Sequence, residues 1–181
     1  MSVIPGSVQF LSATAAQEDQ ATAQTAGGFV AVQAGLTGRV RLSPRTVLLV
    51  SASGQWASKN LYRSEKFSLG GPDGVRAYPV GEASGDLGLL VRGEARWTPE
   101  ASGSWAHGLE LGLFLDVGSV IINQRPWAGG SNDRTLAGAG VGVTYAPTDA
   151  TMVRIEYAVP LHLQGSVPGE SRLWFLLQSS M

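Results

Sequence analysis

The stretch LGLLVRGEARW, residues 87–97, decides the fold of this chain. Its odd positions are apolar or small and end on Trp97, whereas its even positions include Arg92, Glu94 and Arg96. Such alternation is typical of a β-strand, because successive side chains of a strand point to opposite faces. The stretch therefore predicts a strand with one apolar face and one largely charged face.

The same alternation recurs along most of the chain. In residues 109–117 every odd position is Leu or Val, and Glu110 and Asp116 lie on the even face. Five further segments follow the same pattern, at residues 30–42, 48–56, 138–145, 153–161 and 172–178. The sequence therefore predicts an all-β protein with seven antiparallel strands.

The connections differ in length on the two sides of these strands. Short turns at 43–45, 98–106 and 146–150 alternate with long loops at about 57–86, 118–134 and 162–170. This arrangement is typical of outer-membrane barrels. The apolar strips of about nine to eleven residues suit tilted transmembrane strands. Aromatic residues on these strips fit an interfacial girdle, namely Trp56, Trp97, Tyr145 and Tyr157.

Two alternatives to a membrane barrel share this pattern. A soluble sandwich and a lipocalin-like barrel also have alternating strands, but their apolar face points inward. Alternation alone does not say which face meets water, so both alternatives stay open at the level of the pattern.

Composition excludes several classes of function. The 181 residues carry a net charge of -1 and no Cys, and no apolar run suits a membrane helix. We therefore expect no nucleic-acid partner, no disulfide and no Cys-ligated zinc. With only His107 and His162 available, we also expect no metal and no cofactor. The first ten residues lack the features of a secretory signal, so we expect an exported protein with this start to be a fragment.

Catalytic motifs are also missing. The chain has no Gly-x-Ser-x-Gly elbow, phosphate-binding loop or paired-His spacing. The enzyme alternative is an outer-membrane lipase with a Ser beside His107 or His162, and no such pair has a recognisable spacing. We therefore expect that the chain is not an enzyme.

One long connection has a distinctive sequence. Residues 67–86, FSLGGPDGVRAYPVGEASGD, hold five Gly, two Pro and a single Arg, Arg76. With the strands LGLLVRGEARW and LGLFLDVGSV that follow it, this loop resembles the transporters of two-partner secretion, the haemolysin secretion/activation and haemagglutinin-export family. That family belongs to a superfamily of outer-membrane barrels which also contains barrel-assembly factors. The resemblance covers residues 26–181.

The resemblance implies a sixteen-stranded barrel behind two periplasmic POTRA domains. The long loop after the eleventh strand folds back into the lumen, where the Arg of a Val-Arg-Gly-Tyr/Phe motif meets an Asp of the inner wall. In this chain the loop motif is Val75, Arg76, Ala77 and Tyr78, and the inner-wall motif is Phe114, Asp116 and Gly118. Ala77 stands where the family has Gly, which argues against a positive φ at that residue.

Five predicted strands follow the loop, as the resemblance requires. We therefore interpret residues 1–181 as the C-terminal part of an outer-membrane β-barrel, about seven to eight of sixteen strands, without POTRA domains or N-terminal strands. The implied function is translocation of a secreted exoprotein, of haemolysin or adhesin type, across the Gram-negative outer membrane. The implied partners are the exoprotein, outer-membrane lipid and the barrel-assembly machinery. The alternatives are a barrel-assembly factor and a small stand-alone membrane barrel.

Other inward positions receive simpler interpretations. We expect the pair of Arg76 and Asp116 to be partly hydrated, and the inward glycines at 138, 140 and 142 to leave space for the tucked loop. The final strand of such barrels usually ends on an aromatic residue, and Met181 takes that place here. The remaining charged residues of the wall are expected only to line a polar lumen: Arg92, Glu94, Arg96, Glu110, Arg154, Glu156 and Arg172.

Overall fold

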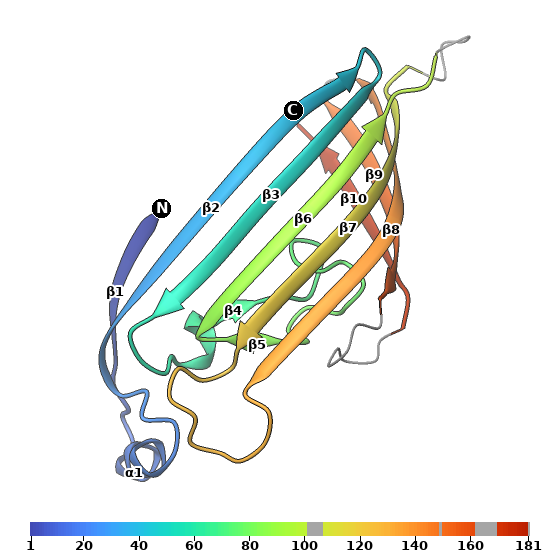
Figure 1. The fold of residues 1–181 in the computed structure, drawn as a ribbon. Coiled ribbons are helices and arrows are strands. Elements are labelled where there is room, and N and C mark those ends of the chain that lie inside the picture. Colours follow the sequence, from blue (N-terminus) through green and yellow to red (C-terminus); the bar gives the residue numbers. More distant parts are fainter. Residues whose placement is uncertain (101–106, 149, 162–169, 181) are drawn as a thin grey trace.

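One antiparallel sheet of eight strands dominates the computed structural model, which describes residues 1–100, 107–148, 150–161 and 170–180 (Figure 1). The strand order is β1-β2-β3-β6-β7-β8-β9-β10, so neighbours in the sheet are also neighbours along the chain. The strands are β1 (Ser2–Val8), β2 (Gly27–Ser43), β3 (Thr46–Ala57), β6 (Leu87–Trp97), β7 (Leu109–Ile121), β8 (Asp133–Thr148), β9 (Thr151–Pro160) and β10 (Arg172–Ser179). All seven predicted strands are present, and the all-β prediction is confirmed.

Two elements near the N-terminus were not predicted. Strand β1 pairs with β2 from Ser2 opposite Gln33 to Val8 opposite Gly27, and its Pro5 and Gly6 hide the alternation. Helix α1 (Ala13–Ala21) has no apolar stripe, so its sequence carries no helical period. No helix in the described part of the chain is long and apolar enough to cross a membrane.

Helix α1 is joined to β2 through a buried carboxylate. Asp19 accepts hydrogen bonds from the backbone N–H of Thr25 at 2.9 Å and from its hydroxyl at 2.7 Å. The N–H of Ala26 donates to the other carboxylate oxygen at 2.8 Å. These bonds satisfy backbone donors that the turn would otherwise leave unpaired.

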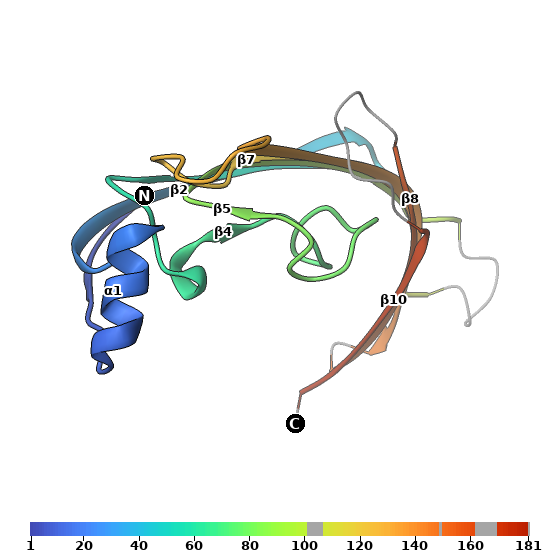
Figure 2. The ribbon, with the colours of Figure 1, turned by 90° about the horizontal axis from the view of Figure 1, so that it is seen from below.

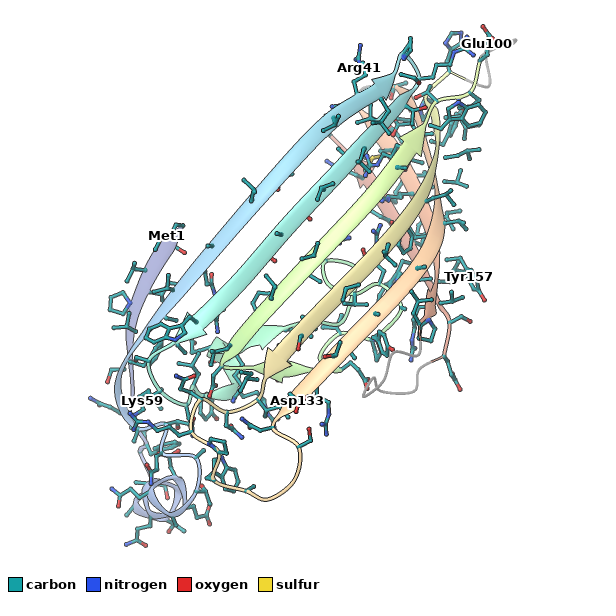
Figure 3. The ribbon with its side chains drawn as sticks, viewed as in Figure 1. Met1, Arg41, Lys59, Glu100, Asp133 and Tyr157 are labelled. Atoms are coloured by element: carbon teal, nitrogen blue, oxygen red, sulfur yellow. The ribbon has the colours of Figure 1, made fainter. Side chains whose placement is uncertain are left out.

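The exposed face of the sheet is apolar. On β7, Leu113 and Leu115 are 65% and 51% exposed, whereas Phe114 and Asp116 between them are 5% and 0% exposed. Tyr157 on β9 likewise points away from the sheet on its outer side (Figure 3). A soluble sandwich would bury the Leu side chains, so the outward apolar face identifies a membrane-facing surface. The transmembrane-barrel prediction is confirmed and the soluble alternatives are wrong.

The connections separate by length as predicted. Arg41 and Glu100 lie at the end of the sheet with the short turns, and Lys59 and Asp133 lie at the end with the long loops (Figures 1 and 3). Parts of three connections lie outside the described residues, namely 101–106 and 149 in short connections and 162–169 in a long one. His162 and Met181 lie outside them as well.

The main apolar core lies on the inner side of the curved sheet. The connection between β3 and β6, residues 58–86, folds back under the concave face (Figure 2). We call this segment the lumenal loop, and it contains the short strands β4 (Phe67–Ser68) and β5 (Ser84–Gly85) and the 3-10 turn η1 (Arg63–Glu65). Its buried residues pack against the wall in one cluster: Leu69, Val75, Ala77, Tyr78 and Ala83 from the loop, and Leu90, Phe114, Val120, Leu136 and Ala158 from the strands.

Candidate functional site: a loop fastened to the inner wall

The tip of the lumenal loop is folded on itself before it meets the wall. Strands β4 and β5 pair at Phe67 opposite Gly85, and beyond them the N–H of Gly71 donates to the carbonyl of Tyr78 at 3.0 Å. The N–H of Tyr78 donates in turn to the carbonyl of Val75 at 3.1 Å. Within the described residues Gln24 is the one non-Gly residue with positive φ, so Ala77 does not adopt that conformation, as predicted. The tip therefore presents Arg76 from a compact turn.

Arg76 and Asp116 form the contact that the family resemblance implied. The side chain of Arg76 donates from Nε to Oδ2 and from Nη2 to Oδ1 of Asp116, both at 2.9 Å. The backbone N–H of Arg76 adds a third bond to Oδ2 at 3.1 Å. Two parallel bonds between a guanidinium and a carboxylate give both strength and a fixed orientation.

Two further carboxylates bind the same guanidinium. Nη1 of Arg76 donates to Oε2 of Glu94 at 2.9 Å and to Oε1 of Glu156 at 2.6 Å. The guanidinium carbon also lies 3.4 Å from the ring centroid of Phe114, a cation–π distance. The interpretation of Glu94 and Glu156 as mere lining of the lumen is therefore wrong, because both belong to the fastening of the loop.

The contact is dry. Arg76 is 1% exposed and Asp116 is fully buried, so the expected partial hydration of this pair is wrong. Burial by itself lowers the pKa of Arg76, but its bonds to Asp116, with smaller contributions from Glu94 and Glu156, raise that pKa above its ordinary value. The guanidinium therefore stays charged while the loop is docked.

Basic residues of the wall surround these carboxylates. Arg96 donates from Nε to Glu94 at 2.6 Å, and Arg154 donates from Nη2 to Glu156 at 2.7 Å. Arg92 donates to the loop carbonyls of Asp73 and Pro72, both at 3.1 Å. The wall thus holds the loop backbone as well as its Arg side chain.

Glycines of the wall make room for the loop. A Cβ at Gly138 would lie 2.5 Å from the Cβ of Ala77, and a Cβ at Gly118 would lie 2.5 Å from Cδ2 of Leu69. Both distances are too short for carbon atoms, so a larger residue at Gly138 would displace Ala77, and one at Gly118 would displace the side chain of Leu69. The predicted space for the loop is confirmed at Gly138, where the Cβ of Ala77 fills it. At Gly140 and Gly142 the prediction is wrong, because a Cβ there would meet wall residues such as Phe114 and Glu156 instead of the loop.

A second anchor lies at the base of the loop and was not predicted. The buried carboxylate of Asp86 accepts the N–H of Leu61 at 3.0 Å and the N–H of Gln124 at 2.7 Å. Nζ of Lys66 lies 2.7 Å from the same carboxylate and also donates to the carbonyl of Ile122. Asp86 therefore ties the beginning and the end of the lumenal loop to the connection between β7 and β8.

The pattern of alternation contained part of the signal for the missed residues. Glu94 and Glu156 occupy inward positions of their strands, but their role depends on the curvature of the sheet, which brings β6 and β9 around one guanidinium. Asp86 lies in a segment without any period, so only the folded structure shows its partners.

Comparison with known proteins gives a consistent picture. The family model described as haemolysin secretion/activation protein ShlB/FhaC/HecB matches residues 6–145. The heme/hemopexin transporter protein HuxB of Haemophilus influenzae (strain 86-028NP) is 32% identical over 116 residues, which cover 62% of this chain and 20% of HuxB. Another Haemophilus influenzae HuxB is 32% identical over 120 residues, with the same coverage.

Solved structures show the same fold. CdiB from Escherichia coli matches with a TM-score of 0.67 and 18% identity, over 87% of this chain and 28% of CdiB. CdiB from Acinetobacter baumannii matches with a TM-score of 0.63 and 20% identity, over 86% of this chain and 27% of CdiB. The chain spans about a fifth of the length of the curated relatives it matches.

Proposed function

The chain belongs to the haemolysin secretion/activation family ShlB/FhaC/HecB, and on this premise we propose that it forms the C-terminal part of an outer-membrane pore for a secreted protein. Members of this family are outer-membrane transporters, which agrees with the outward apolar face of the sheet. The polar inner wall offers an unfolded polypeptide a path lined by side chains that hydrogen-bond in water. The proposed partners are the secreted exoprotein, the outer-membrane lipid and the machinery that assembles the barrel.

The observation that carries the proposal is the lumenal loop fastened by Arg76 to Asp116, Glu94 and Glu156. We propose that the loop motif Val75, Arg76, Ala77 and Tyr78 and the wall motif Phe114, Asp116 and Gly118 form a lock that holds this loop at one place in the lumen. A passing polypeptide shares the lumen with the loop, so the position of the loop controls the free cross-section. The function needs no catalytic residue, and we propose no enzymatic activity.

The open edges of the sheet bear on the alternatives. β1 and β10 are the two ends of the strand order and do not pair with each other, so the eight strands do not close into a small barrel. Unpaired strand edges are costly in lipid, and further strands must cover them in the membrane. The family match also favours a secretion transporter over a barrel-assembly factor.

A secretion assay tests this proposal in the full-length transporter that contains the chain. We expect Arg76→Ala to reduce the amount of exoprotein in the medium sharply, while the heat-modifiable, folded barrel stays in the outer membrane. Arg45→Ala is the matched control, because in the described part of the chain the side chain of Arg45 pairs with exposed Glu100, at the end with the short turns. Secretion at the wild-type level by Arg76→Ala, or an equal loss with Arg45→Ala, would contradict the proposed lock.

A further inference from the structure

The final strand of the sheet touches the tip of the lumenal loop. Trp174 lies on β10 opposite Glu156 of β9, and its indole Nε1–H donates to the backbone carbonyl of Arg76 at 2.7 Å. This contact joins residues 98 positions apart along the chain. Trp174 therefore reaches the same turn of the loop that the carboxylates hold.

The contacts of Arg76 are divided among different strands. Its backbone N–H and guanidinium donate to Asp116 of β7, and Nη1 also donates to Glu94 of β6 and Glu156 of β9. Its backbone carbonyl accepts a hydrogen bond from Trp174 of β10. A buried carbonyl needs a hydrogen-bond donor, because an unpaired buried carbonyl costs free energy. The indole of Trp is a rigid donor that accepts no hydrogen bond, which suits this single purpose.

The place of β10 in the sheet gives this contact its significance. β10 is the last strand of the order and pairs only with β9 among the described residues. The carboxylates that bind Arg76 come from β6, β7 and β9, and Trp174 adds a contact from β10 to the same turn of the loop. The docked loop thus braces β10 from the inside.

We propose that Trp174 is a positioning residue that couples docking of the loop tip to the order of β10. The loop is held less firmly without the indole N–H, and β10 is held less firmly when the loop leaves. This coupling is a property of the resting barrel and does not depend on what the barrel transports, so it can fail while the proposed function stands.

Thiol labelling in a full-length transporter without other Cys residues tests the effect on the loop, and this chain contributes none. Val75→Cys places a thiol at a fully buried position beside Arg76, and a water-soluble reagent reaches it only when the tip undocks. We expect Trp174→Phe, which keeps an aromatic ring, to raise the labelling rate of that thiol about fivefold to a hundredfold, the range for leaving one buried polar group unpaired. Trp97→Phe is the control, since Trp97 is exposed on the apolar face of β6 and should leave the rate unchanged.

Hydrogen exchange of the β10 amides tests the reverse direction. We expect Arg76→Ala to speed exchange across Arg172–Ser179, because the loop then no longer holds Trp174. If Trp174 only filled space on β10, Trp174→Phe would speed exchange in β10 and leave the loop thiol as protected as before. That result, or unchanged β10 exchange in Arg76→Ala, would overturn the coupling.

Discussion

Replacing Asp116 by Asn measures how strongly the wall holds the loop. The carboxylate accepts three bonds from Arg76, from Nε, Nη2 and the backbone N–H. The Asn amide has the same shape but one acceptor oxygen and one donor NH₂ group, so its NH₂ group must face a donor of Arg76. Asp116→Asn therefore removes the charge and also places two donors against each other.

The size of the effect follows from burial and from the remaining partners. Breaking a buried ion pair by removing one partner costs about 3 to 5 kcal/mol. Glu94 and Glu156 still hold Nη1 of Arg76 in the variant, so we take the lower end, about 3 kcal/mol. Since each 1.4 kcal/mol is a factor of ten, the undocked fraction of the loop should rise roughly a hundredfold.

The buried thiol of Val75→Cys again reports undocking in the full-length transporter. Val80→Cys, on an exposed residue of the same loop, shows whether the reagent itself reaches the lumen equally in each variant. Glu110→Gln is the matched control, because it makes the same chemical change on β7 at a residue that pairs only loosely with Arg96, at 3.8 Å. A rate for Asp116→Asn within twofold of the parent, or an equal rise for Glu110→Gln, would refute the reasoning.

Three further predictions concern the fit of the loop, the faces of the sheet and the base of the loop. Gly138→Ala should expose the Val75→Cys thiol, and adding Ala77→Gly should restore its protection. Gly142→Ala is the control and should have little effect, because a Cβ there meets its nearest neighbour at an ordinary 3.4 Å. If Ala77→Gly does not rescue Gly138→Ala, the steric argument is wrong. Single cysteines at residues 36–41 of β2 should alternate, with thiols at odd positions reacting with a water-soluble reagent and thiols at even positions protected by lipid, and uniform labelling would remove the membrane assignment. Asp86→Asn should raise proteolytic cleavage of residues 58–66 by about tenfold or more, as expected for a lost hydrogen bond to a charged group, and an unchanged cleavage rate would show that the base needs no carboxylate.

The strands could be predicted because alternation is a local property. Each strand from β2 to β10 in the large sheet carries its own inward and outward faces in its sequence, and the exposure of neighbouring residues such as Leu113 and Phe114 follows that pattern. β1 was not predicted because Pro5 and Gly6 interrupt its alternation, although it pairs regularly with β2. Local pattern therefore fails where a short strand depends on its neighbour for its conformation.

The site could be predicted only in part, because its members come from distant segments. The resemblance of the loop supplied Arg76 and Asp116, and alternation placed Asp116 on the inner face. Glu156 and Trp174 reach Arg76 only through the curvature of the sheet, which no local pattern encodes. To predict which side chains meet inside a barrel, one therefore needs the strand order and the register as well as the inward and outward faces of each strand.

We infer that the charges of the wall keep the proposed lock reversible even though Arg76 and Asp116 are buried. If the loop leaves with Arg76, an isolated buried carboxylate on the wall would oppose the movement by several kcal/mol. Nε of Arg92 already lies 3.5 Å from Oδ1 of Asp116, and Nη2 of Arg154 donates to both carboxylate oxygens of Glu94 at 2.8 and 2.9 Å. Each carboxylate thus keeps a neighbouring arginine after Arg76 has left, and water that enters the vacated space hydrates the carboxylate oxygens that lose a partner. Burial makes the docked state specific, while the neighbouring arginines limit the free-energy cost of leaving it. The proposed passage of a polypeptide through the lumen would require both properties.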